Sequence, residues 1–153
     1  MKKLPHKLGR ERIYNKNFDK IRQNVVLWEV IKIKQHQDLE LRFISTNSKY
    51  KQGIRLSIDA GQGEIMVNGI KSRGIEIWED DFSETITLSC YSSEEVLSVY
   101  NIFDLDKEHG GRRSQAPSCG MIIEQNNNIY RFHCNDAGFQ TNFDKLVFEI
   151  KLL

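Results

Sequence analysis

Short stretches of alternating apolar and polar residues follow one another along most of this chain. Leu39, Leu41 and Phe43, for example, alternate with Glu40 and Arg42. Because successive side chains of a β-strand point to opposite faces, this spacing places the three apolar side chains on one face. The stretch therefore predicts a strand with one buried and one solvated face.

Runs of this type, rich in β-branched and aromatic residues, recur with polar connections between them. They are found at residues 25–33, 39–43, 54–58, 64–67, 75–78, 85–91, 96–103, 121–124, 129–134 and 146–153. A succession of about nine or ten strands without helical patterns between them is typical of antiparallel sandwiches and barrels. We therefore predict an all-β fold, an antiparallel two-sheet, jelly-roll-like β-sandwich.

Asparagine and glycine residues mark the clearest turns. Asparagine tolerates positive φ, so the break Asn126–Asn128 between two alternating runs predicts a β-hairpin. Gly61–Gly63 separates the runs 54–58 and 64–67 and predicts a second hairpin.

The chain has 153 residues and a net charge of +1, but its charges are unevenly distributed. Residues 1–34 carry ten Lys and Arg against three acids, whereas residues 35–153 carry twelve against eighteen. A chain of this length suits a single domain. We predict a basic N-terminal arm, residues 1–24, followed by the β-sandwich domain, residues 25–153.

The basic arm has two interpretations. It could bind nucleic acid, since Lys and Arg neutralise phosphates. Its basic residues are scattered singly, however, and Tyr14 and Phe18 are its only Phe, Tyr or Trp residues. The other interpretation is therefore an extended segment that lies along the acidic body of the protein.

Cysteine usage and hydropathy indicate the compartment. Cys90, Cys119 and Cys134 are odd in number and lack Cys-x-x-Cys spacing, which predicts reduced, buried thiols. No apolar stretch approaches the roughly 18 residues of a membrane span, and the N-terminus lacks the apolar core of a secretory signal. These features predict a cytoplasmic protein without a membrane partner.

Two loops contain most of the candidate chemistry, residues 104–118 and residues 135–144. In a meander of antiparallel strands they would leave the sheet at the same end. The glycines before Arg112 and Arg113 would let backbone amides approach an anion that the two guanidinium groups could grip. The candidate ligand-binding residues in these loops are His109, Arg112, Arg113 and Asn135.

The same loops predict a calcium site as a candidate cofactor site. Calcium prefers six to eight oxygen ligands, and carboxylates are abundant here. The candidate metal ligands are Asp104, Asp106, Asp136 and Asp144. The spacing is not that of an EF-hand, and solvated turn formers are the alternative interpretation.

Enzymatic alternatives are less well supported by the pattern. Cys119 could act as a nucleophile with His109 or His133 as the base, but a reactive thiol needs an electropositive setting. Zinc is disfavoured because the adjacent His133 and Cys134 of one strand point to opposite faces.

The C-terminal third resembles a family of small bacterial β-sandwich proteins that end in a strand of the type Asp-Phe-Asp-Asp-Leu-Val-Phe. The resemblance is carried by 99–104, 120–124, 130–136 and by Asn142–Phe148. It also extends to the ends of bacterial surface β-sandwich modules, some of which are thought to bind calcium and carbohydrate. Asn142 and Lys145 replace the acids of that pattern, which weakens the implied ion site.

These observations predict a non-catalytic binding module that recognises a carbohydrate, a peptide or a partner protein through the two loops. The alternatives are an enzyme that uses Cys119 or the Asp and His residues of the loops, and an intracellular toxin-neutralising or protein-interaction protein. A shallow groove with an aromatic rim would favour carbohydrate, whereas a flat apolar face would favour a protein partner or a homo-oligomer.

Overall fold

The computed structural model describes residues 9–18, 24–58, 62–81, 84–105, 111–137 and 140–153. Within these ranges the chain is all-β, as the alternating pattern predicts, with two short 3-10 helices at Lys16–Phe18 and Glu79–Asp81. The strands are β1 (Ile13–Tyr14), β2 (Val26–Lys32), β3 (His36–Thr46), β4 (Lys51–Ile58), β5 (Glu64–Val67), β6 (Ile70–Ser72), β7 (Gly74–Trp78), β8 (Ile86–Tyr91), β9 (Val96–Asp104), β10 (Arg112–Ser114), β11 (Gly120–Asn126), β12 (Ile129–Asn135) and β13 (Leu146–Leu152).

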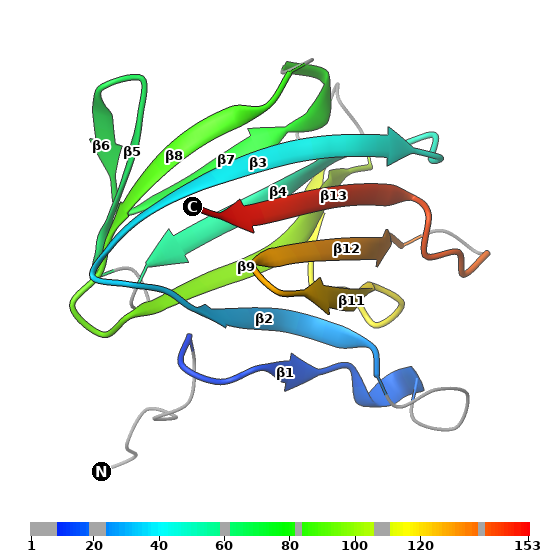
Figure 1. Ribbon diagram of the computed structural model, residues 1–153. Coiled ribbons are helices and arrows are strands. Elements are labelled where there is room, and N and C mark those ends of the chain that lie inside the picture. Colours follow the sequence, from blue (N-terminus) through cyan, green and yellow to red (C-terminus); the bar gives the residue numbers. More distant parts are fainter. Residues whose placement is uncertain (1–8, 19–23, 59–61, 82–83, 106–110, 138–139) are drawn as a thin grey trace, which may run out of the picture.

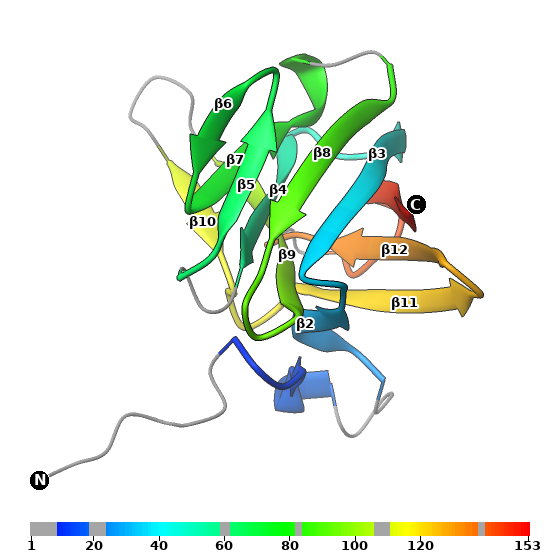
Figure 2. The same ribbon diagram turned by 60° about the vertical axis from the view of Figure 1, so that its left-hand side comes forward.

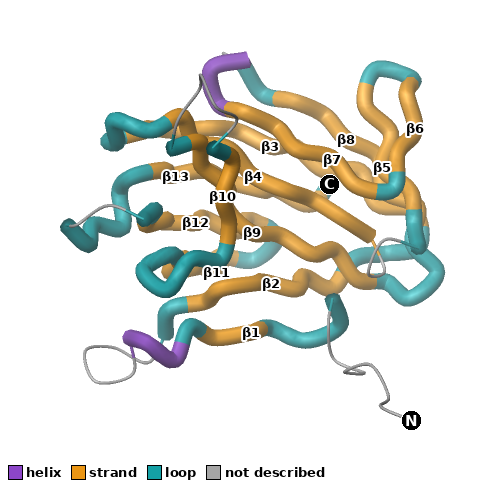
Figure 3. Tube along the Cα trace, turned by 180° about the vertical axis from the view of Figure 1, so that it is seen from behind, coloured by secondary structure: helices purple, strands orange, loops and turns teal. Residues whose placement is uncertain are grey.

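The strands form an antiparallel sheet that curls round until it is nearly closed into a barrel (Figure 1). Along the sheet the strand order is β6-β5-β8-β3-β13-β12-β11-β2-β9-β4-β7. β1 is added beside β2, and β10 is added beside the end of β9, as Figure 3 shows from behind.

The predicted two-sheet jelly-roll sandwich is not confirmed, because one continuous path of paired strands runs from β6 to β7. In the middle of this path β2 pairs with β11 through Val26 and with β9 through the segment Glu29–Lys32. The end strands β6 and β7 do not pair with each other, but only Arg73 separates them in the chain (Figure 2). Alternation along a strand shows its faces but not its neighbours, so the sequence could not distinguish these arrangements.

The core occupies the inside of the curled sheet. Phe132 of β12 and Phe148 of β13 stack there with a centroid separation of 4.4 Å and an interplanar angle of 4°. Leu39 and Leu41 of β3 are fully buried, as their alternation with charged residues predicts. Burial of such side chains stabilises the fold by about 1.5–3 kcal/mol each.

The outer face of the same strands carries charged side chains in cross-strand register. Arg42 of β3, Glu149 of β13 and Arg131 of β12 lie in one row. Glu149 accepts hydrogen bonds from Arg42 Nη2 at 2.7 Å and from Arg131 Nε at 2.9 Å. Partial burial alone would raise the pKa of Glu149, but these hydrogen bonds outweigh it and hold the pKa below its usual range.

This row predicts a defined pH dependence of stability. A depressed carboxyl pKa contributes stability above the unfolded-state pKa, and this contribution is lost as the pH falls through the folded-state pKa. We expect Glu149→Gln to lower the free energy of unfolding by roughly 1–2 kcal/mol at neutral pH and to flatten its decline towards pH 3. Urea titrations across this pH range measure the effect. Glu124→Gln, at an exposed carboxylate, is the control, and an equal loss in both variants would contradict the prediction.

The turns agree with the sequence at one hairpin and differ at another. β11 and β12 pair along their full length, and Asn127 in their turn has φ 57°, as the triple-Asn break predicts. The hairpin expected around Gly61–Gly63 is wrong, because β4 pairs with β7 and β9 while β5 pairs with β6 and β8. A Cβ at Gly63 would lie 2.1 Å from Ile58 Cγ2, so the chain crosses closely between strands that do not pair.

Part of the predicted basic arm belongs to the sheet. Ile13 and Tyr14 pair with β2, and Phe18 is buried against Phe143. Arg12 forms an ion pair with the buried Glu29 at 2.5 Å. These contacts favour the interpretation that the described part of the arm lies along the body of the protein. Among the described residues, no helix has the length and apolar character needed to cross a membrane.

Candidate functional site

An open groove is lined by the turn between β3 and β4. This turn lies at the right-hand end of the sheet in Figure 1. Its volume is about 660 Å³. One side is the turn Thr46–Tyr50, and the other is formed by Gln140 and Lys145 from the segment that leads into β13. The lining therefore combines hydroxyl, amide and ammonium groups with one aromatic ring.

Hydrogen bonds between the two sides fix the shape of this groove. The backbone N–H of Asn47 donates to the carbonyl oxygen of Lys145 at 3.1 Å. Its side-chain amide donates to Asp144 Oδ2 at 2.9 Å. Within the turn, Tyr50 N donates to Ser48 Oγ at 3.1 Å. The predicted calcium ligand Asp144 thus holds the β3–β4 turn against the neighbouring loop.

A buried carboxyl group, that of Asp136, lies beneath the lining residue Ser48. Ser48 Oγ donates to Asp136 Oδ2 at 2.5 Å, and Gln52 Nε2 donates to the same oxygen at 3.0 Å. Asp136 and Gln52 are buried, whereas Ser48 also lines the groove. The position of the Ser48 side chain is therefore set from below by groups that solvent does not reach.

The two loops that the sequence predicts to form the site, residues 104–118 and residues 135–144, are joined through hydrogen bonds of Asn135. The buried side-chain amide of Asn135 donates to the carbonyl oxygens of Ser118 at 2.6 Å and Asp136 at 3.0 Å. Its Oδ1 accepts a hydrogen bond from Asn142 N, and its own carbonyl accepts one from Asn101 Nδ2 at 3.1 Å. Asn135 thus connects the loops to each other, with its amide directed into the fold.

Cys119 lies within this buried network. Its thiol contacts Asn101 Oδ1 at 3.4 Å, and the residue is buried. Burial raises the pKa of Cys119 to about 11, only partly offset by hydrogen bonds. The thiolate is the nucleophilic form of cysteine, so this thiol is protonated at neutral pH and its environment is not that of a reactive cysteine. Cys90 and Cys134 are likewise free and buried.

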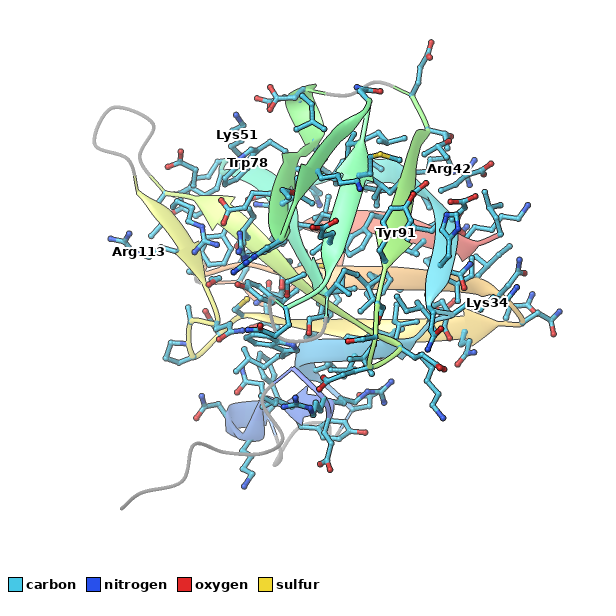
Figure 4. All side chains as sticks on the ribbon, turned by 90° about the vertical axis from the view of Figure 1, so that its left-hand side faces the viewer. Lys34, Arg42, Lys51, Trp78, Tyr91 and Arg113 are labelled. Carbon is cyan, nitrogen blue, oxygen red and sulfur yellow. The ribbon has the colours of Figure 1, made fainter. Side chains whose placement is uncertain are left out.

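The two candidate arginines lie on β10 and are not among the residues that line the groove. Arg112 Nη2 contacts Glu76 Oε2 of β7 at 2.5 Å, and Arg55 shares the same carboxylate at 3.4 Å. Arg113 is exposed and points away from the sheet in Figure 4. The candidate residue His109 lies outside the described residues.

The three candidate calcium ligands that the structure describes, Asp104, Asp136 and Asp144, form no metal-binding cluster with one another. Asp104 is at the end of β9, Asp136 is under Ser48, and Asp144 binds Asn47. Asp106 lies outside the described residues. Within the part of the chain that the structure describes, no three His, Cys, Asp or Glu side chains are placed to hold a metal ion.

Sequence reasoning missed the turn Thr46–Tyr50, which supplies most of the groove. A signal was present, because polar turn formers followed by Lys49 and Tyr50 separate two alternating runs. The juxtaposition with Lys145 was not visible, because it depends on β3 pairing with β13 across the length of the chain.

No protein family, curated protein or solved structure matches this chain. Its function is therefore inferred from the chemistry of the groove.

Proposed function

We propose that this protein is a non-catalytic binding module that holds a carbohydrate in the groove between the β3–β4 turn and the start of β13. The observation that carries the proposal is the groove itself. Its volume, about 660 Å³, is within the range of roughly 300–1,000 Å³ that is typical of small-molecule sites.

The lining suits a ligand with many hydroxyl groups. A sugar hydroxyl both donates and accepts hydrogen bonds, and so do the Thr46 hydroxyl and the amides of Asn47 and Gln140. Ser48 Oγ donates its proton to Asp136 and offers the sugar an acceptor. The Tyr50 ring adds an aromatic surface on which the apolar face of a sugar ring can pack. A shallow polar groove with one aromatic residue therefore favours carbohydrate over an apolar ligand.

The groove is also held in place before a ligand arrives. Asn47 is bonded to both Asp144 and Lys145, and Ser48 is bonded to the buried Asp136. Groups that are already ordered lose less conformational freedom on binding, which favours affinity.

The arrangement of carboxyl groups favours binding over hydrolysis. Most glycoside hydrolases use two carboxyl groups on either side of the scissile bond. Among the described residues that line this groove there is neither a carboxyl group nor a histidine. Asp136 is covered by Ser48, and Asp144 is engaged by Asn47.

The proposal places the ligand at Thr46–Tyr50, Gln140 and Lys145. Of the loop 135–144, Gln140 lines the groove, whereas the candidate residues Asn135, Asp136 and Asp144 do not. None of the described residues of the loop 104–118 lines the groove. That loop instead supports the loop 135–144, since the Ser118 carbonyl oxygen accepts a hydrogen bond from the Asn135 amide.

We expect Tyr50→Ala and Gln140→Ala each to weaken binding of the best sugar in a mono- and oligosaccharide panel by on the order of tenfold. Saturation-transfer NMR identifies the sugar, and calorimetric titration measures the affinities. Tyr14→Ala replaces an exposed tyrosine of β1 and is the matched control. Absence of binding across the panel, or an equal loss in the Tyr14 control, would overturn the proposal.

A further inference from the structure

The charged groups that line the groove have one sign. Lys49 and Lys145 are its charged lining residues, and within the described residues neither forms an ion pair. Lys49 Nζ lies 5.1 Å from the centroid of the Tyr50 ring, so its ammonium group is held over the aromatic face. Other lysines of this protein differ, since Lys51 contacts Asp80 at 3.2 Å and Lys71 contacts Glu64 at 3.9 Å.

Asp144 and Asp136 lie beside the groove, and no ion pair between either of them and Lys49 or Lys145 is found among the described residues. Asp144 precedes Lys145 in the chain, but its Oδ2 accepts the Asn47 amide. Asp136 is buried beneath Ser48 and Gln52. A concave surface lined by two ammonium groups and by no carboxyl group attracts an anionic ligand.

Building on the proposed carbohydrate site, we infer that its ligand is an acidic sugar, one that carries a carboxylate or sulfate group bound by Lys49 and Lys145. An ammonium group is a compact charge that accepts either anion, whereas a planar guanidinium would favour bidentate contact with carboxylate. The neutral lining residues then bind the sugar hydroxyls, and the lysines select for charge.

The test compares ligands that differ only in charge. Calorimetry with oligogalacturonate, its methyl ester and a neutral galactose oligomer separates charge recognition from hydroxyl recognition, and a sulfated galactose oligomer distinguishes sulfate from carboxylate as the source of charge. We expect at least one anionic oligomer to bind on the order of tenfold more tightly than its uncharged counterpart. The difference should shrink as added salt screens the charges.

Matched variants assign the effect to the two lysines. Lys49→Gln combined with Lys145→Gln should remove the preference for the anionic oligomer over the neutral one. Lys34→Gln, at an exposed lysine between β2 and β3, should leave this preference and both affinities unchanged (Figure 4). Circular dichroism of each variant confirms folding.

The outcomes separate this inference from the proposed function. Equal affinity for charged and uncharged oligomers, or a preference that survives in the double variant, would overturn the inference and leave the carbohydrate site standing. If none of the oligomers in the wider sugar panel binds, the proposed function fails and the inference fails with it.

Discussion

Replacing Asp136 by alanine is expected to lower the free energy of unfolding by about 3 kcal/mol, because two hydrogen-bond donors lose their acceptor. Gln52 is buried, and its Oε1 already lacks a partner within the described residues. Loss of the Asp136 carboxyl group would leave its Nε2 with the Tyr50 carbonyl oxygen, at 3.2 Å, in place of the shorter bond to Asp136. Ser48 would lose the contact that fixes its hydroxyl in the groove. Equilibrium unfolding in urea measures the change.

Two further variants separate the buried bonds from other effects of the substitution. Asp136→Asn retains the shape and one acceptor oxygen, and we expect it to cost about half as much. Asp144→Ala removes an exposed acid from the same segment and should change stability by less than about 1 kcal/mol. A loss in Asp136→Ala no greater than that in Asp144→Ala would show that the stability of the fold does not depend on the hydrogen bonds to this buried carboxyl group.

The strands could be predicted from the sequence because one face of each is buried. Leu39 and Leu41 show the pattern clearly, since their charged neighbours lie on the outer face. Very short strands carry too few residues for such a pattern, and β1, with Ile13 and Tyr14 alone, is an example. The barrel-like closure could not be predicted from the sequence, because it depends on pairings between distant segments such as β2 with β9.

The buried polar network beneath the groove could be predicted in part, because polar residues occupy inward positions of two strands. Gln52 has the same parity along β4 as the buried Ile54 and Leu56, and Asn101 has the same parity along β9 as Val99. A polar residue at an inward position requires a buried partner, so these two positions indicate an internal polar network. The identity of the partners, above all Asp136, follows only from the three-dimensional arrangement.

Replacing Arg12 by alanine is expected to cost about 3 kcal/mol of stability, because it leaves the buried carboxylate of Glu29 without its counter-ion. Arg12 Nε and Nη2 donate to the two carboxylate oxygens of Glu29 at 2.9 Å and 2.5 Å. The Glu29 side chain is only 3% exposed, so solvent cannot replace the lost hydrogen bonds. Val30 N also donates to Glu29 Oε1, which fixes the carboxylate in place. Thermal and urea unfolding both report the loss.

Arg10 provides a matched control in the same segment, since it pairs with Glu94 and both side chains of that pair are exposed. Exposed ion pairs contribute little, so Arg10→Ala should cost no more than about 1 kcal/mol. Combining Arg12→Ala with Glu29→Gln should recover part of the loss, because no buried charge then remains unpaired. Equal effects of Arg10→Ala and Arg12→Ala would contradict this account and would mean that the segment before β1 is not anchored through Glu29. A large difference between them would show that the N-terminal segment is part of the folded domain, because a freely extended arm could not distinguish its two arginines.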